Sequence, residues 1–373
     1  MTHTNLPDVA TPAFLVDRNL VQRNCDTMRE KALASGVAFR PHVKTHKSVE
    51  IGRMQHGGAA GPVTVSTLAE AESFMRDGFR DITYAVPMAP SAGKLQRAAD
   101  LASRIDRLSV LIDSEVALHA IEEFASSHGV MFDVFLKVDC GYHRAGVDPA
   151  DPDSARLAIA MARSETVRFQ GLLTHAGHSY NARDAEEVAR IAAEEAASLT
   201  RFRALLAPEG LGDTRRSVGS TPTASIVERF TECDEVRPGN YVFYDAFQAV
   251  LGSCALEDVA VSVLTTVVGS YPERRSLIVD AGALAMSKDV SPEHLTPGSG
   301  FGLVCDVNLQ PLPMRLIALS QEHGKIESQM HVPVGTRLRI VPNHSCLTSA
   351  MFDTYQILDR GRVVDQWRPV RGW

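Results

Sequence analysis

The chain has 373 residues, of which 45% are hydrophobic and 22% charged, and its formal net charge is -7. This length fits a barrel of about 250 residues plus a smaller domain. The acidic balance excludes a basic nucleic-acid-binding face, no apolar run is long enough to span a bilayer, and the polar first residues lack a signal-peptide core, so we expect a cytoplasmic protein that binds neither nucleic acid nor membrane.

Strands and helices alternate along the chain up to about residue 250. A short strand at 11–17 precedes a helix that Asp17 can cap, and Thr67 with Glu70 forms a capping box at a later helix start. Eight further strands are expected at 37–43, 63–65, 82–86, 108–112, 134–138, 167–173, 217–219 and 235–236. This pattern is typical of a (β/α)8 barrel, although a doubly wound sheet alternates in the same way.

After residue 252 the segments become short and rich in β-branched residues, with Gly, Pro and Asp between them. They lie at 259–268, 276–279, 314–319, 336–341, 354–358 and 362–367. Such segments predict an antiparallel β-domain. We therefore place a barrel at 18–250 and a β-domain at 251–373, and we expect residues 1–17 to add a strand to the β-domain.

The segment 39–47 (FRPHVKTHK) holds the first candidate for chemistry. In a strand, Arg40, His42, Lys44 and His46 share one face because side chains alternate. A lysine that is crowded by cations and partly desolvated loses its proton more easily and can attack a carbonyl, so Lys44 is the candidate nucleophile. A solvated basic edge strand is the ordinary alternative, which buried neighbouring strands disfavour.

Two segments that follow the expected fifth and sixth strands carry further candidates. Arg144 either holds an anionic or aromatic ligand or is a solvated charge between turn glycines. His175, His178 and Tyr180 lie within six positions at a barrel mouth, and each can exchange a proton. Spacing alone does not show which of them faces a ligand.

Glycine-containing loops follow the expected seventh and eighth strands and predict a phosphate site. Their candidate residues are Gly219, Ser220, Thr221, Gly239, Asn240 and Tyr241. Successive N–H groups and hydroxyls make an anion-binding nest, and barrels bind phosphates at these two loops, although Gly, Ser and Pro also make ordinary turns. A phosphate site across the mouth from a reactive lysine indicates pyridoxal phosphate.

His344 and Cys346 are the candidate metal ligands. Their i, i+2 spacing in an extended segment points both side chains the same way, and imidazole with thiolate suits zinc. Two ligands leave positions for water or substrate, as a catalytic metal requires. A buried cysteine beside a turn histidine is the ordinary alternative, and the six cysteines contain no CxxC pair.

Together these segments resemble the D-serine dehydratase and D-threonine aldolase family of fold-type III pyridoxal-phosphate enzymes, relatives of alanine racemase. The likeness covers nearly the whole chain, including 41–47 (PHVKTHK), 65–71 (VSTLAEA), 219–222 (GSTP), 238–241 (PGNY), 321–324 (QEHG), 343–346 (NHSC) and 370–373 (VRGW). The resemblance implies an alanine racemase-type (β/α)8 barrel with a β-domain, a homodimer, Lys44 as the cofactor lysine, and a divalent metal on His344 and Cys346.

The resemblance further implies a lyase for D-3-hydroxy amino acids, and two reactions remain open. A dehydratase eliminates water from D-serine or D-threonine to give a 2-oxo acid and ammonia; an aldolase gives glycine and an aldehyde. Cys346 matches the dehydratase branch, since the family's bacterial D-threonine aldolases have Asp there; a thiolate favours zinc, whereas an aspartate favours magnesium or manganese. His178 favours the aldolase, because it can act as base on the hydroxyl. We place the dehydratase first.

Three alternatives remain beside these reactions. D-3-hydroxyaspartate stays open as the substrate because basic residues are plentiful around the mouth. A racemase needs a second acid/base on the opposite cofactor face and has no use for a metal. A non-catalytic pyridoxal-phosphate carrier resembles the barrel alone and does not need the β-domain.

Overall fold

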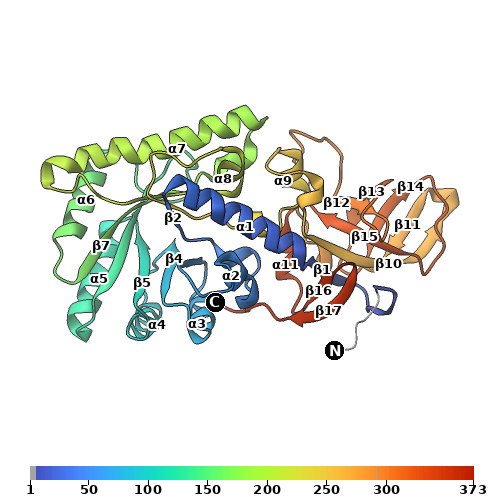
Figure 1. Ribbon diagram of the computed structural model, residues 1–373, viewed down its shortest axis with the longest axis horizontal. Coiled ribbons are helices and arrows are strands. Elements are labelled where there is room, and N and C mark those ends of the chain that lie inside the picture. Colours follow the sequence, from blue (N-terminus) through green and yellow to red (C-terminus); the bar gives the residue numbers. More distant parts are fainter. Residues whose placement is uncertain (1–5, 291) are drawn as a thin grey trace. The chain divides into compact units, whose positions relative to one another are not determined.

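The computed structural model describes residues 6–290 and 292–373, and the chain divides into two compact units (Figure 1). Unit 1 comprises Met1–Asp26 and Asn240–Pro369, and unit 2 comprises Thr27–Gly239 and Val370–Trp373. The division therefore lies at residue 239, whereas the sequence analysis places the end of the barrel at residue 250. Of the segment 1–17, residues 1–5 lie outside the described part.

Unit 2 is the barrel. Its eight strands are all parallel, in the spatial order β2-β9-β8-β7-β6-β5-β4-β3. A parallel bridge from His42 to Thr64 joins the two ends of this order, so the sheet closes. The (β/α)8 barrel is confirmed and a doubly wound sheet is excluded. The strands are β2 (Ala38–Phe39), β3 (Val63–Val65), β4 (Asp81–Pro87), β5 (Arg107–Ile112), β6 (Phe132–Lys137), β7 (Val167–Leu173), β8 (Arg216–Val218) and β9 (Glu235–Val236).

Helices surround the strands of the barrel (Figure 1). They are α1 (Arg18–Ser35), whose first residues belong to unit 1, α2 (Val49–Gln55), α3 (Leu68–Arg76), α4 (Ala92–Ala102), α5 (Glu115–His128), α6 (Pro152–Arg163), α7 (Ala185–Leu206) and α8 (Thr221–Ile226), with 3-10 turns η2 (Val43–Thr45), η3 (Gly177–Asn181) and η4 (Ala207–Glu209). Thr67 Oγ1 accepts a hydrogen bond from Glu70 N at 3.0 Å, as expected. A capping box also needs a bond from Thr67 N to the Glu70 carboxylate. This part of the prediction is wrong, because the carboxylate accepts a hydrogen bond from Ser66 N instead.

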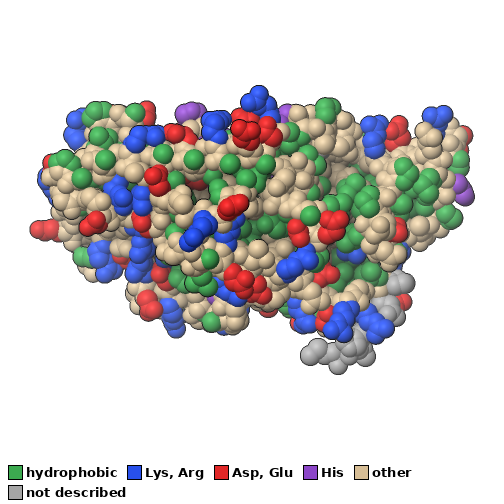
Figure 2. All heavy atoms as spheres, turned by 45° about the horizontal axis from the view of Figure 1, so that its top comes forward, with side chains coloured by type: hydrophobic (Ala, Val, Ile, Leu, Met, Phe, Trp, Pro, Cys, Tyr) green, Lys and Arg blue, Asp and Glu red, His purple; other side chains and the backbone are tan. Residues whose placement is uncertain are grey.

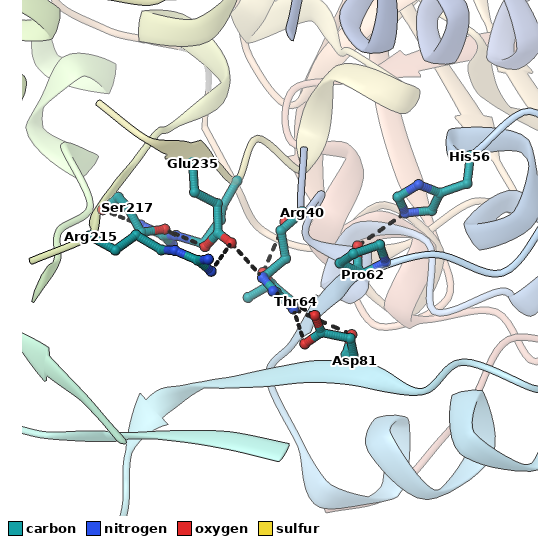
Figure 3. A network of polar contacts seen from close by, with 9 residues as sticks. Arg40, His56, Pro62, Thr64, Asp81, Arg215, Ser217 and Glu235 are labelled. Carbon is teal, nitrogen blue, oxygen red and sulfur yellow. Dashed lines mark hydrogen bonds and ion pairs between the residues drawn. The ribbon is translucent and has the colours of Figure 1, made fainter. Parts of the chain in front are cut away.

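A buried network of ion pairs links β4 and β9 through Arg40 (Figure 3). The Arg40 guanidinium lies 2.8 Å from Glu235 and 2.7 Å from Asp81, and Glu235 also accepts from Ser217 Oγ. Burial disfavours the charge on Arg40, but Glu235 and Asp81 outweigh this effect and raise its pKa. The expectation that Arg40 shares a face with Lys44 is therefore wrong: β2 ends at Phe39, and the 3-10 turn η2 breaks the alternation.

Unit 1 is built on a nine-stranded sheet with the order β11-β14-β13-β12-β15-β10-β1-β16-β17, in which β11 also pairs with β10. All its pairs are antiparallel except β1 with β16. The first six strands in this order therefore form a closed antiparallel barrel. The strands are β1 (Ala13–Asp17), β10 (Val261–Tyr271), β11 (Ser276–Val279), β12 (Gly302–Cys305), β13 (Pro311–Leu319), β14 (Gly324–Ser328), β15 (Arg337–Pro342), β16 (Tyr355–Asp359) and β17 (Arg362–Trp367).

The helices of unit 1 are all short, apart from the start of α1. They are α9 (Ala246–Val250), α10 (Ala283–Met286) and α11 (Ser345–Ala350), with 3-10 turns η1 (Leu6–Asp8), η5 (Asn240–Val242), η6 (Leu256–Asp258) and η7 (Pro272–Arg274). Two of the sheet's strands, β12 and β14, have no counterpart among the segments that the sequence analysis expects.

On the face drawn in Figure 2, basic and acidic side chains are interspersed, and no continuous basic field covers it. Within the described residues, no helix combines the length and the apolar character that crossing a bilayer needs.

Candidate functional site

Lys44 lies half-buried in η2, directly after the buried His42. His42 caps this turn, since its Nδ1 accepts a hydrogen bond from Lys44 N at 3.3 Å. Burial, together with the charges of Lys44, Arg237, His175 and His46, lowers the pKa of His42 far below its usual value. A neutral His42 thus holds the backbone of the candidate lysine.

His175 follows β7 and lies close enough to Lys44 for the charge of Lys44 to affect its pKa. Its Nδ1 is 3.2 Å from the carbonyl oxygen of Gly219. Burial lowers the pKa of His175 far below the usual value, and the charges of Lys44, Lys137 and Arg144 add to the effect. The structure therefore brings four of the predicted site residues together in unit 2: Lys44, His175, Arg144 and Gly219.

Arg144 is exposed, and its guanidinium lies over the ring of Tyr142 at 4.9 Å from the ring centroid. Asp139 shapes this loop, because its Oδ1 accepts hydrogen bonds from the N–H groups of Gly141, Tyr142 and His143. Gly141 and His143 both have positive φ, so the turn is tight. The loop thus carries a fixed positive charge next to His175.

His178 and Tyr180 lie in η3, after β7, and both are half-buried. The Nδ1 atom of His178 is buried and has no hydrogen-bond partner among the described residues. Burial lowers the pKa of His178, and His143 and Arg190 contribute in the same direction. Neutral His178 can therefore accept a proton. No ligand role for Tyr180 follows from its position alone.

The loop at Gly219 is constrained by its backbone conformation and by close neighbours. Gly219 has a φ of +123°, and a Cβ there would lie 3.0 Å from Arg237 N. Ser220 begins α8 with a capping box that uses Thr223, and its Oγ is 2.9 Å from Ser179 Oγ. The N–H groups of Gly219 and Ser220 already donate to Glu195 Oε1 and Thr223 Oγ1, so the N–H groups that follow them in this loop are the candidates for phosphate contacts.

Gly239 places the second expected loop against the lysine turn. A Cβ on Gly239 would lie 3.0 Å from His42 Cβ, and His42 N donates to Pro238 O at 2.9 Å. A side chain at Gly239 would therefore be crowded by His42. The two glycine loops and Lys44 belong to the same unit, and an amine together with glycine loops is the donor set that suits pyridoxal phosphate.

Asn240 and Tyr241, also expected to bind the cofactor, belong to unit 1. Asn240 Nδ2 donates to Asp245 Oδ2 at 2.8 Å and to Ser345 Oγ at 2.7 Å, and it lies 3.7 Å from Cys346 Sγ. Tyr241 has no exposed surface. The structure thus places the Asn240 amide with the candidate metal ligands, and any cofactor contact of Tyr241 is through its backbone.

His344 and Cys346 meet at the start of α11, where they hydrogen-bond to each other. The extended segment expected here is wrong, because only His344 is extended and Cys346 lies in the first turn of the helix. Burial opposes a proton on His344, but Cys346, Asp245 and Asp289 outweigh it and raise the pKa of His344 to about 9. These surroundings favour positive charge, and an imidazole–thiol donor pair fits a divalent metal.

Within 6–290 and 292–373, no group of three or more His, Cys, Asp or Glu side chains is arranged to hold a metal ion. A metal on His344 and Cys346 would need further ligands, which water or substrate can supply.

The sequence analysis does not identify two buried acids at these sites. Glu195 Oε1 accepts from Thr174 Oγ1, Ala176 N and Gly219 N, which joins the His175 loop to the glycine loop. Glu195 lies four residues from each of the buried Ile191 and Leu199 of α7, so these three residues share one helix face. An acid on an otherwise apolar face could have identified it in the sequence. Asp245 offers no such local signal.

Two family models match the chain: the alanine racemase N-terminal domain over residues 16–246 and a serine dehydratase domain over residues 260–358. D-serine dehydratase from Dictyostelium discoideum is 38% identical, over 99% of this chain and 98% of that protein. D-threonine aldolase from Arthrobacter sp. is 28% identical, over 97% of this chain and 92% of that protein.

The chain is also similar to D-threo-3-hydroxyaspartate dehydratase from Delftia sp., at 40% identity over 97% of this chain and 98% of that protein. A solved structure of a D-threo-3-hydroxyaspartate dehydratase, a cysteine-to-alanine variant in a metal-free form, superposes with a TM-score of 0.92. Its sequence identity is 39%, over 99% of this chain and 100% of that one.

Proposed function

Because the chain belongs to the family that joins an alanine racemase N-terminal domain to a serine dehydratase domain, we propose that it is a lyase that uses pyridoxal phosphate and a divalent metal to eliminate water from D-3-hydroxy amino acids. The products are a 2-oxo acid and ammonia. The observation that carries this proposal is the thiol of Cys346 beside His344, in a chain whose other unit gathers Lys44, His175 and two glycine loops.

In unit 2, Lys44 would hold the cofactor through its amine, and the loops at Gly219 and Gly239 would receive the phosphate. When bound, pyridoxal phosphate withdraws electrons from the Cα of an attached amino acid. Once the amine of the substrate has replaced Lys44 on the cofactor, the freed Lys44 amine would take the proton from Cα from one side, so only one enantiomer is expected to react. Neutral His42 keeps the Lys44 turn in place through its bond to Lys44 N, and Arg144 supplies a fixed positive charge.

In unit 1, His344 and Cys346 hold the cation. We propose zinc, with manganese or magnesium as the alternatives, because a thiolate is a soft ligand. A divalent metal supplies positive charge for a departing hydroxyl group. Asp245 supports the pair: it accepts hydrogen bonds from Ser345 N, next to Cys346 in the chain, and from Asn240 Nδ2, which lies 3.7 Å from Cys346 Sγ. The metal-free form described for the related dehydratase supports this proposal.

Retro-aldol cleavage to glycine and an aldehyde is the second candidate. His178 favours it, because its buried Nδ1 lacks a hydrogen-bond partner among the described residues and its lowered pKa leaves it neutral. A neutral imidazole can take the hydroxyl proton of the substrate. The similarity to a D-threonine aldolase supports the same reaction. Arg144 also keeps D-3-hydroxyaspartate among the substrates, since its charge suits a second carboxylate.

A product assay tests the proposal. The enzyme, loaded with pyridoxal phosphate, is incubated with D-serine, D-threonine or D-3-hydroxyaspartate, with zinc or manganese added or chelated, and the products are identified. We expect pyruvate, 2-oxobutyrate or oxaloacetate with ammonia from D-substrates only. Glycine as the main product establishes the aldolase instead. Racemised substrate formed without metal establishes a racemase, and no product from any substrate leaves a non-catalytic carrier.

We also propose that the protein is a homodimer of the cytoplasm. All six cysteines, which lie within the described residues, are free thiols, in keeping with a reducing compartment. Sedimentation equilibrium of the purified protein tests the assembly. We expect twice the chain mass of 40.5 kDa, and a monomer at working concentration contradicts the dimer.

A further inference from the structure

We propose that Tyr142 is a positioning residue whose ring orients the side chains of His178, His175 and Arg144. The inference rests on the proposed function, since these are the groups expected to act on cofactor and substrate. Tyr142 itself needs no contact with either. Its role is to restrict three neighbouring side chains with one rigid ring.

The ring of Tyr142 contacts all three. Its centroid lies 6.0 Å from that of His175, nearly perpendicular at 75°, and 6.3 Å from that of His178 at 30°. The Arg144 guanidinium lies over the ring at 4.9 Å. Aromatic pairs at about 4.5–7 Å and cations within about 6 Å of a ring attract each other, so each contact favours a defined side-chain orientation.

His178 depends on this packing more than His175 does. The ring of His175 is held by its Nδ1 contact with Gly219 O. The buried Nδ1 atom of His178 has no hydrogen-bond partner among the described residues. The backbone of Gly141 is also close, since a Cβ there would lie 3.8 Å from His178 Nε2. The packing of Tyr142 against the His178 ring is therefore a contact that restricts rotation of this ring.

Tyr142 is in turn fixed from two sides. Its backbone N–H donates to Asp139 Oδ1 at 3.0 Å. On the other side its ring lies on Gly177, where a Cβ would be 2.6 Å from Tyr142 Cζ. Gly177 is absent from the residues with positive φ, so its backbone does not require glycine. The close approach of the Tyr142 ring is the reason why a side chain does not fit at Gly177.

Three substitutions test separately the ring of Tyr142, its hydroxyl group and the position of the ring. Tyr142→Leu removes the ring, Tyr142→Phe keeps it, and Gly177→Ala adds a methyl group where the ring lies. The control is Tyr271→Leu, because Tyr271 also carries an arginine over its ring, Arg274 at 4.1 Å, but lies in unit 1. Retention of the cofactor absorption band shows that each variant is folded.

We expect Tyr142→Leu and Gly177→Ala to lower kcat/KM by about 10–100-fold, chiefly in kcat, because misplaced catalytic groups lose this much. Tyr142→Phe and the control should stay within about threefold of wild type, since the ring and its contacts survive. If Tyr142→Phe loses as much activity as Tyr142→Leu, the hydroxyl matters rather than the ring, and the proposal is overturned.

A second readout does not depend on turnover. The groups whose charges act on His178 are Glu195, Asp139, His143 and Arg190, and no variant changes them. In zinc-loaded holoenzyme with labelled histidines, NMR titration should show the pKa of His178 moving toward its ordinary value in Tyr142→Leu and Gly177→Ala, as water reaches the ring. An unchanged titration in Tyr142→Leu overturns the proposal, whatever products the wild-type assay finds.

Discussion

Asp245 is a buried carboxylate that organises the residues around the candidate metal ligands. Its Oδ2 accepts hydrogen bonds from Asn240 Nδ2 at 2.8 Å and Ser345 N at 2.9 Å, while Oδ1 accepts from Gln248 N and caps α9. Burial raises the pKa of Asp245, although the charge of His344 and these hydrogen bonds act in the opposite direction. The carboxylate thus holds in place the backbone that carries Cys346.

Asp245→Asn should weaken zinc binding by about 10–100-fold, the usual effect of losing an outer partner of a metal ligand. Asn still caps a helix, so α9 should remain intact. Competition with a coloured chelator measures the affinity. Asp153→Asn, which changes an exposed carboxylate of α6, serves as the control. Equal zinc affinity in Asp245→Asn and wild type means that Asp245 has no part in holding the metal.

Lys44→Ala and His344→Ala should separate cofactor binding from metal binding. In Lys44→Ala we expect loss of the near-visible absorption band of the lysine-bound cofactor, because the amine that attaches it is gone. In His344→Ala that band should persist while turnover falls by about 100-fold or more, since only the metal site is damaged. Absorption spectra and lyase assays on the same samples check both. A band that survives in Lys44→Ala excludes Lys44 as the attachment point.

At this scale, local spacing predicts contacts only between residues close in sequence. The contact between His344 and Cys346 was predictable, because the two residues are two positions apart in the chain. The bond from Asn240 to Ser345 spans 105 residues, so the sequence placed Asn240 with the phosphate loop that precedes it. The contact between His175 and Gly219 likewise joins two strand ends whose adjacency depends on the closed barrel.

The loop between β8 and α8 is the element on which the phosphate site depends. Gly219 has positive φ, and its N–H donates a hydrogen bond to Glu195. Its carbonyl oxygen lies 3.2 Å from His175 Nδ1. An added Cβ would also come within 3.0 Å of the backbone of Arg237. Both the conformation and the space therefore require glycine, and the loop can change little without moving its neighbours.

Gly219→Ala should lower the affinity for pyridoxal phosphate by about tenfold or more, because a side chain in this conformation costs on the order of 1–2 kcal/mol and the loop would shift away from its binding geometry to relieve that strain. Gly210→Ala is the matched control: its φ is +80°, but an added Cβ there meets nothing within 4 Å. Fluorescence titration of both apoenzymes with cofactor measures the difference. Equal affinities would show that this loop does not hold the phosphate.

The turn η2 shows where strand periodicity stops being informative. The sequence analysis extends the strand through Val43, whereas β2 is only Ala38–Phe39. Pro41 cannot donate to a ladder, and His42 caps the turn that follows. The turn then brings Lys44 near His175, while Arg40 stays among Asp81 and Glu235. The lysine was predictable from its residue type, but its surroundings were not.

The end of η2 also makes stability depend on pH. His46 has no exposed surface, and burial lowers its pKa to about 3. Unfolded histidine titrates near pH 6.5, so below that pH the unfolded chain binds a proton that the folded chain does not. The free energy of unfolding should therefore fall as the pH drops, by about 1.4 kcal/mol per pH unit for this residue, until the pH reaches the folded pKa.

His46→Gln should make this dependence shallower by about that amount between about pH 6.5 and 4.5. Urea unfolding at several pH values measures the slope, and His119→Gln, at an exposed position of α5, is the control. The comparison is of slopes, because the substitution also changes stability at neutral pH. An unchanged slope would mean that His46 is already protonated in the folded protein.

For the whole molecule, the two kinds of β-structure explain which features of the fold were predictable. In the parallel barrel, helical segments separate the strands along the chain. The strand–helix pattern therefore repeats locally, and eight strands could be counted from the sequence. In unit 1, β1 lies between β10 and β16, which are about 250 and 340 residues further along the chain. No local pattern identifies such partners, and β12 and β14 were missed for the same reason.

The central claim is that Lys44 holds the cofactor in one unit, the His344–Cys346 pair holds the metal in the other, and elimination needs both. The most direct test adds D-serine to holoenzyme from which the metal has been removed, while the cofactor spectrum and pyruvate are followed in the same cuvette, and then adds zinc. We predict an immediate spectral change without pyruvate, followed by pyruvate formation once zinc is present. Pyruvate formed at full rate before zinc is added, or D-serine leaving the spectrum unchanged, would contradict the account.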